Sequence, residues 1–209
     1  MARRTKEEAL ATRHRLLDAA ELLFQAQGVS QTTLQQIAQQ AGATRGAIYW
    51  HFKDKADLFN AMMERVILPL ETSPRAAATA PGVDDPLAEI EEGMVHALTL
   101  MTTDPQVRRV FDIATHKVEY VGEMDAVRTR HVEWRSECLA DIERALKRAK
   151  RGGDVPAGVA PKSAAVGLLA LFDGLLLSWM LDRGSFDLPR AGEQAFAVYL
   201  AGLGVCAST

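Results

Sequence analysis

Cysteine is scarce in this sequence of 209 residues, which contains only Cys138 and Cys206. Two cysteines are too few for a disulfide or metal framework, and this usage is typical of a reduced, cytosolic protein. The sequence opens with MARRTKEEALATRHR, a polar and basic stretch without the apolar run of a secretion signal. We therefore expect a protein that stays in the cytoplasm.

Motifs of common enzyme sites are also missing. A di-iron site in a helical bundle requires repeated Glu-x-x-His, but glycine, isoleucine and arginine stand three positions before His96, His116 and His131. No glycine-rich loop of the phosphate-binding type is present. We expect no catalytic residue, no metal site and no cofactor, with a helical-bundle enzyme as the alternative class.

Strand patterns are almost absent, whereas apolar residues recur at helical spacing along the chain. This periodicity predicts an all-α fold. Proline and glycine separate the expected helices, which cover roughly 7–27, 33–40, 123–151, 163–181 and 191–205, with four more starting near residues 44, 54, 86 and 105. The segment 69–86 holds four of the eight prolines, so we expect a linker, or a kinked helix end followed by a loop.

Charge divides the chain unevenly. Residues 1–55 hold eight Lys/Arg and five Asp/Glu, a balance of +3; since the whole chain carries −3, residues 56–209 carry −6. Within the basic part, TRGAIYWHFKDK places a run of ring-bearing residues between basic ones. This pattern indicates that only the N-terminal end meets a polyanion. We predict a DNA-binding domain over 1–55 and a second domain over 56–209 that begins with a linking helix.

The basic part has the spacing of a helix-turn-helix. Thr32 and Gln35 have capping-box spacing at the start of its first helix. Gly42 permits the positive φ of the turn, Ala38 is small where the two helices cross, and Ile48 is expected to point back into the small core. The second helix would then lie in the major groove of DNA. A three-helix domain that binds no DNA has the same spacing and is the alternative.

The second helix and its neighbours carry side chains suited to DNA. Arg45 can grip guanine through two hydrogen bonds, and Gly46 lets the backbone approach. Polar side chains and the start of the fourth helix can contact phosphates, and two arginines on a flexible N-terminal arm can reach a neighbouring groove. Trp50 and Phe52 are expected to pack inside the domain. The predicted DNA contacts are Arg3, Arg4, Thr33, Thr44, Arg45, Gly46, Tyr49, His51 and Lys55.

The segment 163–181 approaches the length of a membrane span, but Asp173 near its middle makes that placement costly. A helix that is apolar on all sides is more often buried between neighbours. A stripe of small residues that includes Gly167 and Gly174 allows another helix to approach closely. Because the helix at 191–205 is also apolar, we predict a homodimer through these two helices and no membrane contact.

The stretch TTLQQIAQQAGATRGAIYWHFKDKADLF at 32–59 resembles the N-terminal signature of the TetR family of transcriptional regulators. The opening MARRTKEEALATRHRLLDAAELLF and the later RRVFDIATHKVEY are similar to the AcrR-like subgroup, which represses multidrug-efflux genes. This resemblance, specific over roughly residues 3–65, implies three DNA-binding helices, a fourth linking helix, and a C-terminal domain that binds a ligand and dimerises. Pro69 departs from the family pattern because it falls in the late turns of the linking helix.

The resemblance also implies a function. It implies a repressor that binds a pseudopalindromic operator on double-stranded DNA as a dimer, is released by a small lipophilic inducer, and controls a multidrug-efflux operon. A metabolic or catabolic operon is the alternative target. The phosphate-contacting positions of the family correspond to Thr33, Tyr49, His51 and Lys55.

A ligand pocket in the C-terminal domain is predicted mainly from this resemblance. Its helices carry isolated polar residues on apolar stripes, which suit a pocket with a few polar anchors; a core with satisfied polar groups is the alternative for each residue. His116 faces away from the apolar side of its helix, so we expect it at the surface or in a dimer contact. The predicted lining residues are Met94, Leu98, Phe111, Thr115, Val118, His131, Trp134, Cys138, Asp173 and Leu176.

Overall fold

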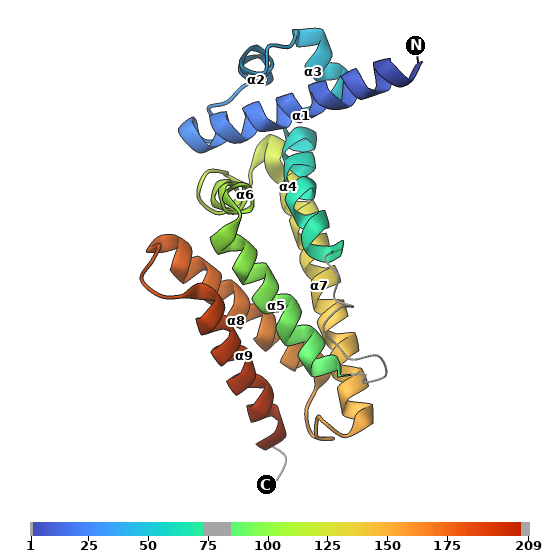
Figure 1. The fold of residues 1–209 in the computed structure, drawn as a ribbon, viewed down its shortest axis with the longest axis vertical. Coiled ribbons are helices and arrows are strands. Elements are labelled where there is room, and N and C mark those ends of the chain that lie inside the picture. Colours follow the sequence, from blue (N-terminus) through green and yellow to red (C-terminus); the bar gives the residue numbers. More distant parts are fainter. Residues whose placement is uncertain (1, 73–84, 206–209) are drawn as a thin grey trace. The chain divides into compact units, whose positions relative to one another are not determined.

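The computed structural model describes residues 2–72 and 85–205, with side chains described over 6–67 and 85–204. These residues form nine α-helices and one short 3₁₀ helix, without a strand (Figure 1). The prediction of an all-α fold is therefore confirmed. The elements are α1 (Ala2–Gln27), α2 (Leu34–Gln40), α3 (Arg45–His51), α4 (Lys55–Thr72), α5 (Pro86–Thr103), α6 (Pro105–His116), η1 (Gly122–Met124), α7 (Asp125–Gly152), α8 (Pro161–Leu181) and α9 (Leu188–Val205).

The contacts group the chain into two compact units. The first comprises Met1–Glu71 with Pro105–Val132, and the second comprises Thr72–Asp104 with Glu133–Thr209. Contacts thus place most of α4, α6 and the start of α7 with the three N-terminal helices. The functional boundary after residue 55 stays a prediction.

Two helix ends differ from the sequence expectations. Helix α1 begins at Ala2 rather than near residue 7, so Arg3 and Arg4 lie in its first turn and not on a flexible arm. Helix α4 continues through Pro69 to Thr72. The remainder of the predicted linker, residues 73–84, lies outside the described residues.

The first unit has a small apolar core at the crossing of α1, α2 and α3. Ile48 is fully buried and Ala38 almost so, which confirms the predicted crossing of α2 and α3. Gly42 has φ 63°, as the turn requires. The capping box lies one residue later than predicted. Thr33, not Thr32, accepts from the amide of Gln36, and the Thr32 hydroxyl instead donates to the carbonyl of Gly28 at 2.7 Å.

A buried carboxylate joins α1, α4 and α6 within the first unit. Glu21 of α1 is 1% exposed. Its oxygens form ion pairs with Arg65 of α4 and with Arg109 of α6, and accept a hydrogen bond from Gln106 of α6 at 2.9 Å. Two guanidinium groups offset the cost of burying one carboxylate. This cluster ties α6 to the N-terminal helices.

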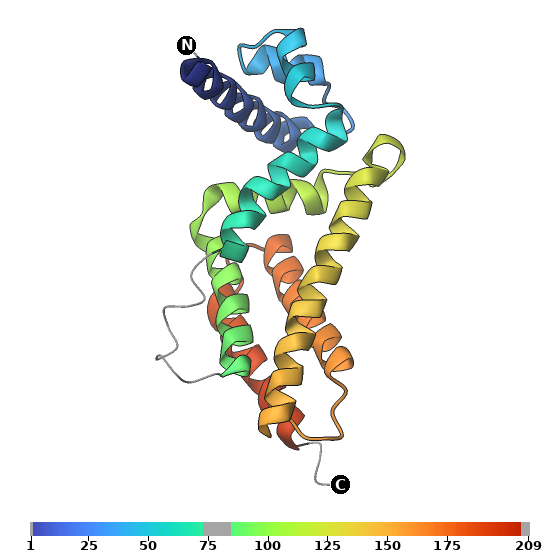
Figure 2. The ribbon, with the colours of Figure 1, turned by 90° about the vertical axis from the view of Figure 1, so that its right-hand side faces the viewer.

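In the second unit, α9 packs against both α5 and α8 (Figure 2). Two glycines allow this approach. A Cβ on Gly192 of α9 would overlap the Leu98 side chain, and a Cβ on Gly167 of α8 would overlap the Tyr199 hydroxyl. That hydroxyl donates to the carbonyl of Ala164 at 3.1 Å. Part of the small-residue stripe on α8 is therefore occupied by a helix of the same chain.

Among the described helices, α8 alone is long and apolar enough to cross a membrane by length and composition. The core helix of a soluble protein meets the same criterion. Leu168, Leu176 and Trp179 of α8 are buried within the chain.

Candidate nucleic-acid interface

Helix α3 is held by local contacts that fix which of its sides faces outward. Its N-cap Thr44 accepts a hydrogen bond from the amide of Ala47 at 3.2 Å. Ile48 and Phe52 point inward and are buried. At 100° per residue, the side opposite Ile48 carries Gly46 and Trp50. The second helix of the helix-turn-helix therefore presents a ring-bearing surface to solvent.

Most of the predicted DNA contacts are exposed, either on or beside α3 or, for Thr33, at the start of α2. Thr33, Thr44, Arg45, Gly46 and Tyr49 are all exposed. The guanidinium carbon of Arg45 lies 5.9 Å from the centroid of the Tyr49 ring, one helical turn away. This cation–π contact orients the arginine along the helix. The exposure suits these residues for DNA, and the contacts themselves stay predictions.

Trp50 is not packed inside the domain, as was predicted, but is 74% exposed. The prediction treated a large aromatic ring as core, although Trp50 lies two residues, or 200°, from the inward-facing Ile48. Its ring meets the His51 ring edge-on, with centroids 4.6 Å apart. Trp50 thus belongs to the outer surface of α3. The expectation that Phe52 is buried is confirmed.

His51, the last residue of α3, lies partly buried beside α1. Burial of the ring, and then the charge of Arg13, lower its pKa from the ordinary value of 6.5. Arg13 itself lies over the Phe52 ring, 5.3 Å from its centroid. At neutral pH the His51 imidazole is therefore neutral in the free protein.

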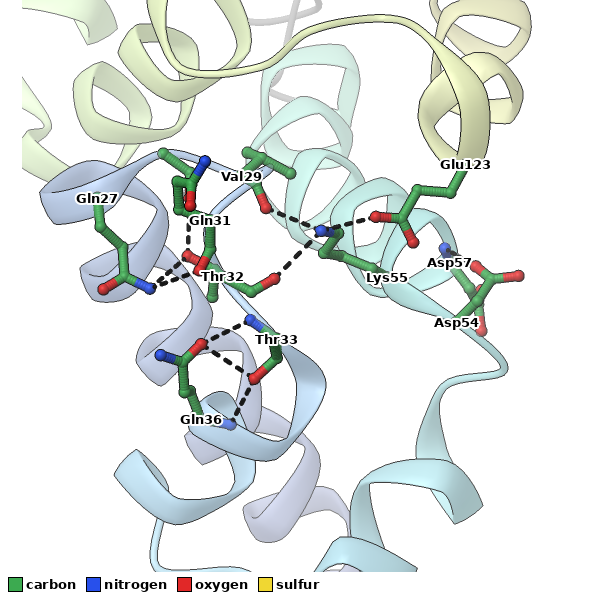
Figure 3. A network of polar contacts seen from close by, with 11 residues as sticks. Gln27, Val29, Gln31, Thr32, Thr33, Gln36, Asp54, Lys55, Asp57 and Glu123 are labelled. Atoms are coloured by element: carbon green, nitrogen blue, oxygen red, sulfur yellow. Dashed lines mark hydrogen bonds and ion pairs between the residues drawn. The ribbon is translucent and has the colours of Figure 1, made fainter.

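Lys55 is placed differently from the sequence expectation. The residue is 7% exposed. Its ammonium donates to the carbonyls of Val29 and Thr32 and pairs with Glu123 (Figure 3). A phosphate contact by this side chain would require it to leave all three partners.

The remaining predicted contacts are Arg3 and Arg4. Both lie in the first turn of α1, and their side chains fall outside the described residues. Their predicted role in a neighbouring groove stays a prediction.

Two family descriptions match this chain. "Bacterial regulatory proteins, tetR family" matches residues 16–62, and "MAATS-type transcriptional repressor, C-terminal region" matches residues 85–204. The chain belongs to the TetR family of transcriptional regulators. The family resemblance drawn from the sequence is thus confirmed, over the C-terminal part as well as the DNA-binding helices.

Individual members of the TetR family extend this likeness over almost the whole chain. The transcriptional regulator AcrR of Shigella flexneri is 39% identical over 201 residues, which cover 96% of this chain and 93% of AcrR. NalD, described as the secondary repressor of the MexAB-OprM multidrug efflux pump in Pseudomonas aeruginosa, superposes with a TM-score of 0.84 at 33% identity, covering 94% and 97% of the two chains. SmeT is described as the repressor of the Stenotrophomonas maltophilia multidrug efflux pump SmeDEF. The structure of its complex with triclosan superposes with a TM-score of 0.81 at 34% identity, covering 92% of this chain and 91% of SmeT.

The residues predicted to line a TetR-family ligand pocket are divided between the two units. Those in the first unit are Phe111, Thr115, Val118 and His131, and those in the second are Met94, Leu98, Trp134, Cys138, Asp173 and Leu176. Thr115 and His131 are exposed. The pocket as a whole stays a prediction.

Within the second unit, one of the predicted pocket residues, Asp173, has a charged partner that the sequence did not indicate. Asp173 of α8 forms an ion pair with Arg135 of α7, and both side chains are partly exposed. Leu98 is fully buried against Gly192 of α9, as a core residue would be. Trp134 and Cys138 on α7 are half-buried.

Proposed function

We propose that this chain represses a multidrug-efflux operon from the cytoplasm, binding a pseudopalindromic operator as a homodimer and leaving it when a lipophilic molecule binds. The observation that carries the proposal is the exposed surface of α3, on which Arg45, Tyr49 and Trp50 lie together. The likeness to NalD and SmeT supports efflux genes as the target.

DNA recognition follows from the chemistry of the α3 surface. Arg45, in the first turn of α3, can bond bidentately to guanine in the major groove. Gly46 has no side chain, so the helix backbone can come close to the bases one turn before Trp50. The hydroxyls of Thr44 and Tyr49, on either side of Arg45 and Gly46 in the sequence, can donate to phosphates. Such contacts set the register of the helix on the duplex.

The dimer would form through the uncovered apolar surface of α8 and α9. Leu181 is 83% exposed and Val198 74% exposed, and Val166 and Leu177 are also exposed. No atom lies within 4 Å of a Cβ built on Gly174, so a partner helix can approach there. A second copy of the chain offers the same surface, which is the requirement for a two-fold interface.

Release by a ligand requires the ligand to favour the form that binds DNA poorly. Triclosan, bound by SmeT, indicates the class: a small, lipophilic, aromatic compound. Asp173 and Arg135 would provide a polar pair beside the half-buried Trp134. A coupling of roughly 1–3 kcal/mol would weaken DNA binding about 5- to 150-fold, and operator DNA would weaken ligand binding by the same factor.

The test is fluorescence anisotropy with a labelled duplex from the region upstream of the gene and a scrambled duplex of equal length. The wild type is expected to prefer the upstream duplex. Arg45→Ala should cost roughly 1–3 kcal/mol and relax the preference at one base pair per half-site. Arg151→Ala removes the same charge from the last turn of α7 and serves as the control. Equal affinity of the wild type for both duplexes would refute the proposal.

Ligand release is measured by calorimetry with triclosan, with and without the upstream duplex. The proposal expects weaker triclosan binding when the duplex is present. Equal binding in the two conditions would contradict the release mechanism and leave operator binding standing.

A further inference from the structure

A buried ammonium stands at the start of α4. The Lys55 Nζ donates to the carbonyl oxygens of Val29 at 2.9 Å and Thr32 at 3.1 Å, and lies 2.7 Å from Oε1 of Glu123. An ammonium has three N–H donors. Each of the three N–H donors of Lys55 therefore has a partner within the protein, and no donor is left for an external phosphate (Figure 3).

The two carbonyl partners belong to the segment through which the chain enters the helix-turn-helix. Val29 and Thr32 lie between α1 and α2, and the next residue, Thr33, is the N-cap of α2. The amide of Val29 also donates to the carbonyl of Lys117, directly after α6, at 2.9 Å. Contacts from α4 and from the residues after α6 thus fix the start of α2, on which α3 packs.

The carboxylate partner comes from a different part of the first unit. Glu123 is the middle residue of η1, between α6 and α7, and its side chain is 60% exposed. Burying an ammonium on a lysine that is 7% exposed costs free energy unless a counter-charge pairs with it. Glu123 supplies this charge on the side of Lys55 away from the two carbonyls.

We infer that Lys55 is a positioning residue, and that its pair with Glu123 holds the entry to the helix-turn-helix in the conformation that presents α3. The inference rests on the proposed operator binding, which it deepens. Lys55 then affects operator binding by holding the conformation of the protein, and not by contacting a phosphate. Because α7 begins at Asp125, directly after η1, a ligand that shifts the start of α7 would move Glu123 and change operator affinity without touching the DNA-facing surface.

The decisive variant is Glu123→Gln, measured in operator binding over a range of salt concentrations. If the pair positions the helix-turn-helix, operator affinity falls about 5- to 150-fold, the range expected when buried groups lose a partner. The dependence of log K on log salt keeps its slope, since no phosphate contact is lost. If Lys55 instead contacts phosphate, removing the competing carboxylate raises affinity and steepens the slope. Either an affinity increase or unchanged affinity overturns the inference.

Lys55→Met gives the complementary measurement. It keeps the aliphatic stem and removes the ammonium. A lost phosphate contact would flatten the salt slope by about 0.9 per lysine, and that result would also overturn the inference. Glu119→Gln is the matched control, because it removes an exposed carboxylate from the same connection between α6 and α7; it should leave affinity within about twofold.

A measurement without DNA separates the inference from the proposed function and remains informative if Lys55→Met folds poorly. Amide hydrogen exchange over residues 29–36 should be faster in Glu123→Gln than in the wild type, and unchanged in Glu119→Gln. Unchanged exchange in Glu123→Gln overturns the inference. A wild type with no operator preference, together with faster exchange in Glu123→Gln, refutes the proposed function and leaves the positioning pair intact.

Discussion

Replacing Gly167 by alanine probes how closely α8 and α9 must approach. A Cβ at this position would overlap the Tyr199 hydroxyl and would stand 2.9 and 3.1 Å from Cζ and Cε2 of the same ring. Real Cβ atoms essentially never lie within 3.0 Å of a neighbouring heavy atom, so the tyrosine must move. When it moves, its hydrogen bond to the Ala164 carbonyl is strained or lost.

The magnitude follows from three terms. Alanine is favoured over glycine inside a helix by about 1 kcal/mol. Overpacking a core costs about 1–3 kcal/mol, and the lost hydrogen bond costs about 0.5–1.5 kcal/mol. The free energy of unfolding should therefore fall by about 0.5–3.5 kcal/mol.

The assay is urea unfolding at one fixed protein concentration, because the stability of a dimer depends on concentration. Gly93→Ala is the matched control: it lies within α5, and a Cβ there meets no atom within 4 Å. It should be neutral or stabilising by up to about 1 kcal/mol. Tyr199→Phe removes the nearest atom, so it should lessen the effect of Gly167→Ala in a double-mutant cycle. If Gly167→Ala is as stable as Gly93→Ala, the reasoning about this helix contact is wrong.

Four further outcomes are expected. Glu21→Gln removes the counter-charge of two arginines and should lower the free energy of unfolding by about 3 kcal/mol, whereas Asp18→Asn, at an exposed carboxylate, should cost less than about 1 kcal/mol; equal losses in urea unfolding would contradict the role of the buried cluster. His51 has a lowered pKa in the free protein, and a phosphate beside it would raise that pKa. Operator affinity should therefore increase as pH falls through the pKa of the complex and level off below the pKa of the free protein; a wild type with the same pH profile as His51→Gln rules this contact out. Gly174→Arg should give folded monomers or aggregates in sedimentation, and a folded wild-type monomer at micromolar concentration would refute the dimer. Trp134→Ala should change triclosan affinity in calorimetry while leaving ligand-free operator binding near wild type, and unchanged triclosan affinity would remove Trp134 from the pocket.

Local sequence patterns were enough to predict the helices of the DNA-binding part and most of the outer surface of α3. These features depend on neighbours within one or two turns: Thr44 caps α3, Gly42 adopts the positive φ of the turn, and Ile48 fixes the buried side. Once Ile48 points inward, the helical repeat alone places Gly46 and Trp50 on the opposite, exposed side. The prediction for Trp50 was wrong because it considered the size of the ring and not its angle around the helix.

Which partner each long or small side chain meets depends on how the helices pack. Lys55 has a flexible four-carbon stem, which can reach outward to DNA or inward to the protein. Its inward position depends on carbonyls 26 and 23 residues earlier and on a carboxylate beyond α6. In the same way, Gly167 faces a tyrosine of α9, and Asp173 faces an arginine of α7. No local pattern specifies such pairs, because residues distant in sequence come together only when the helices pack.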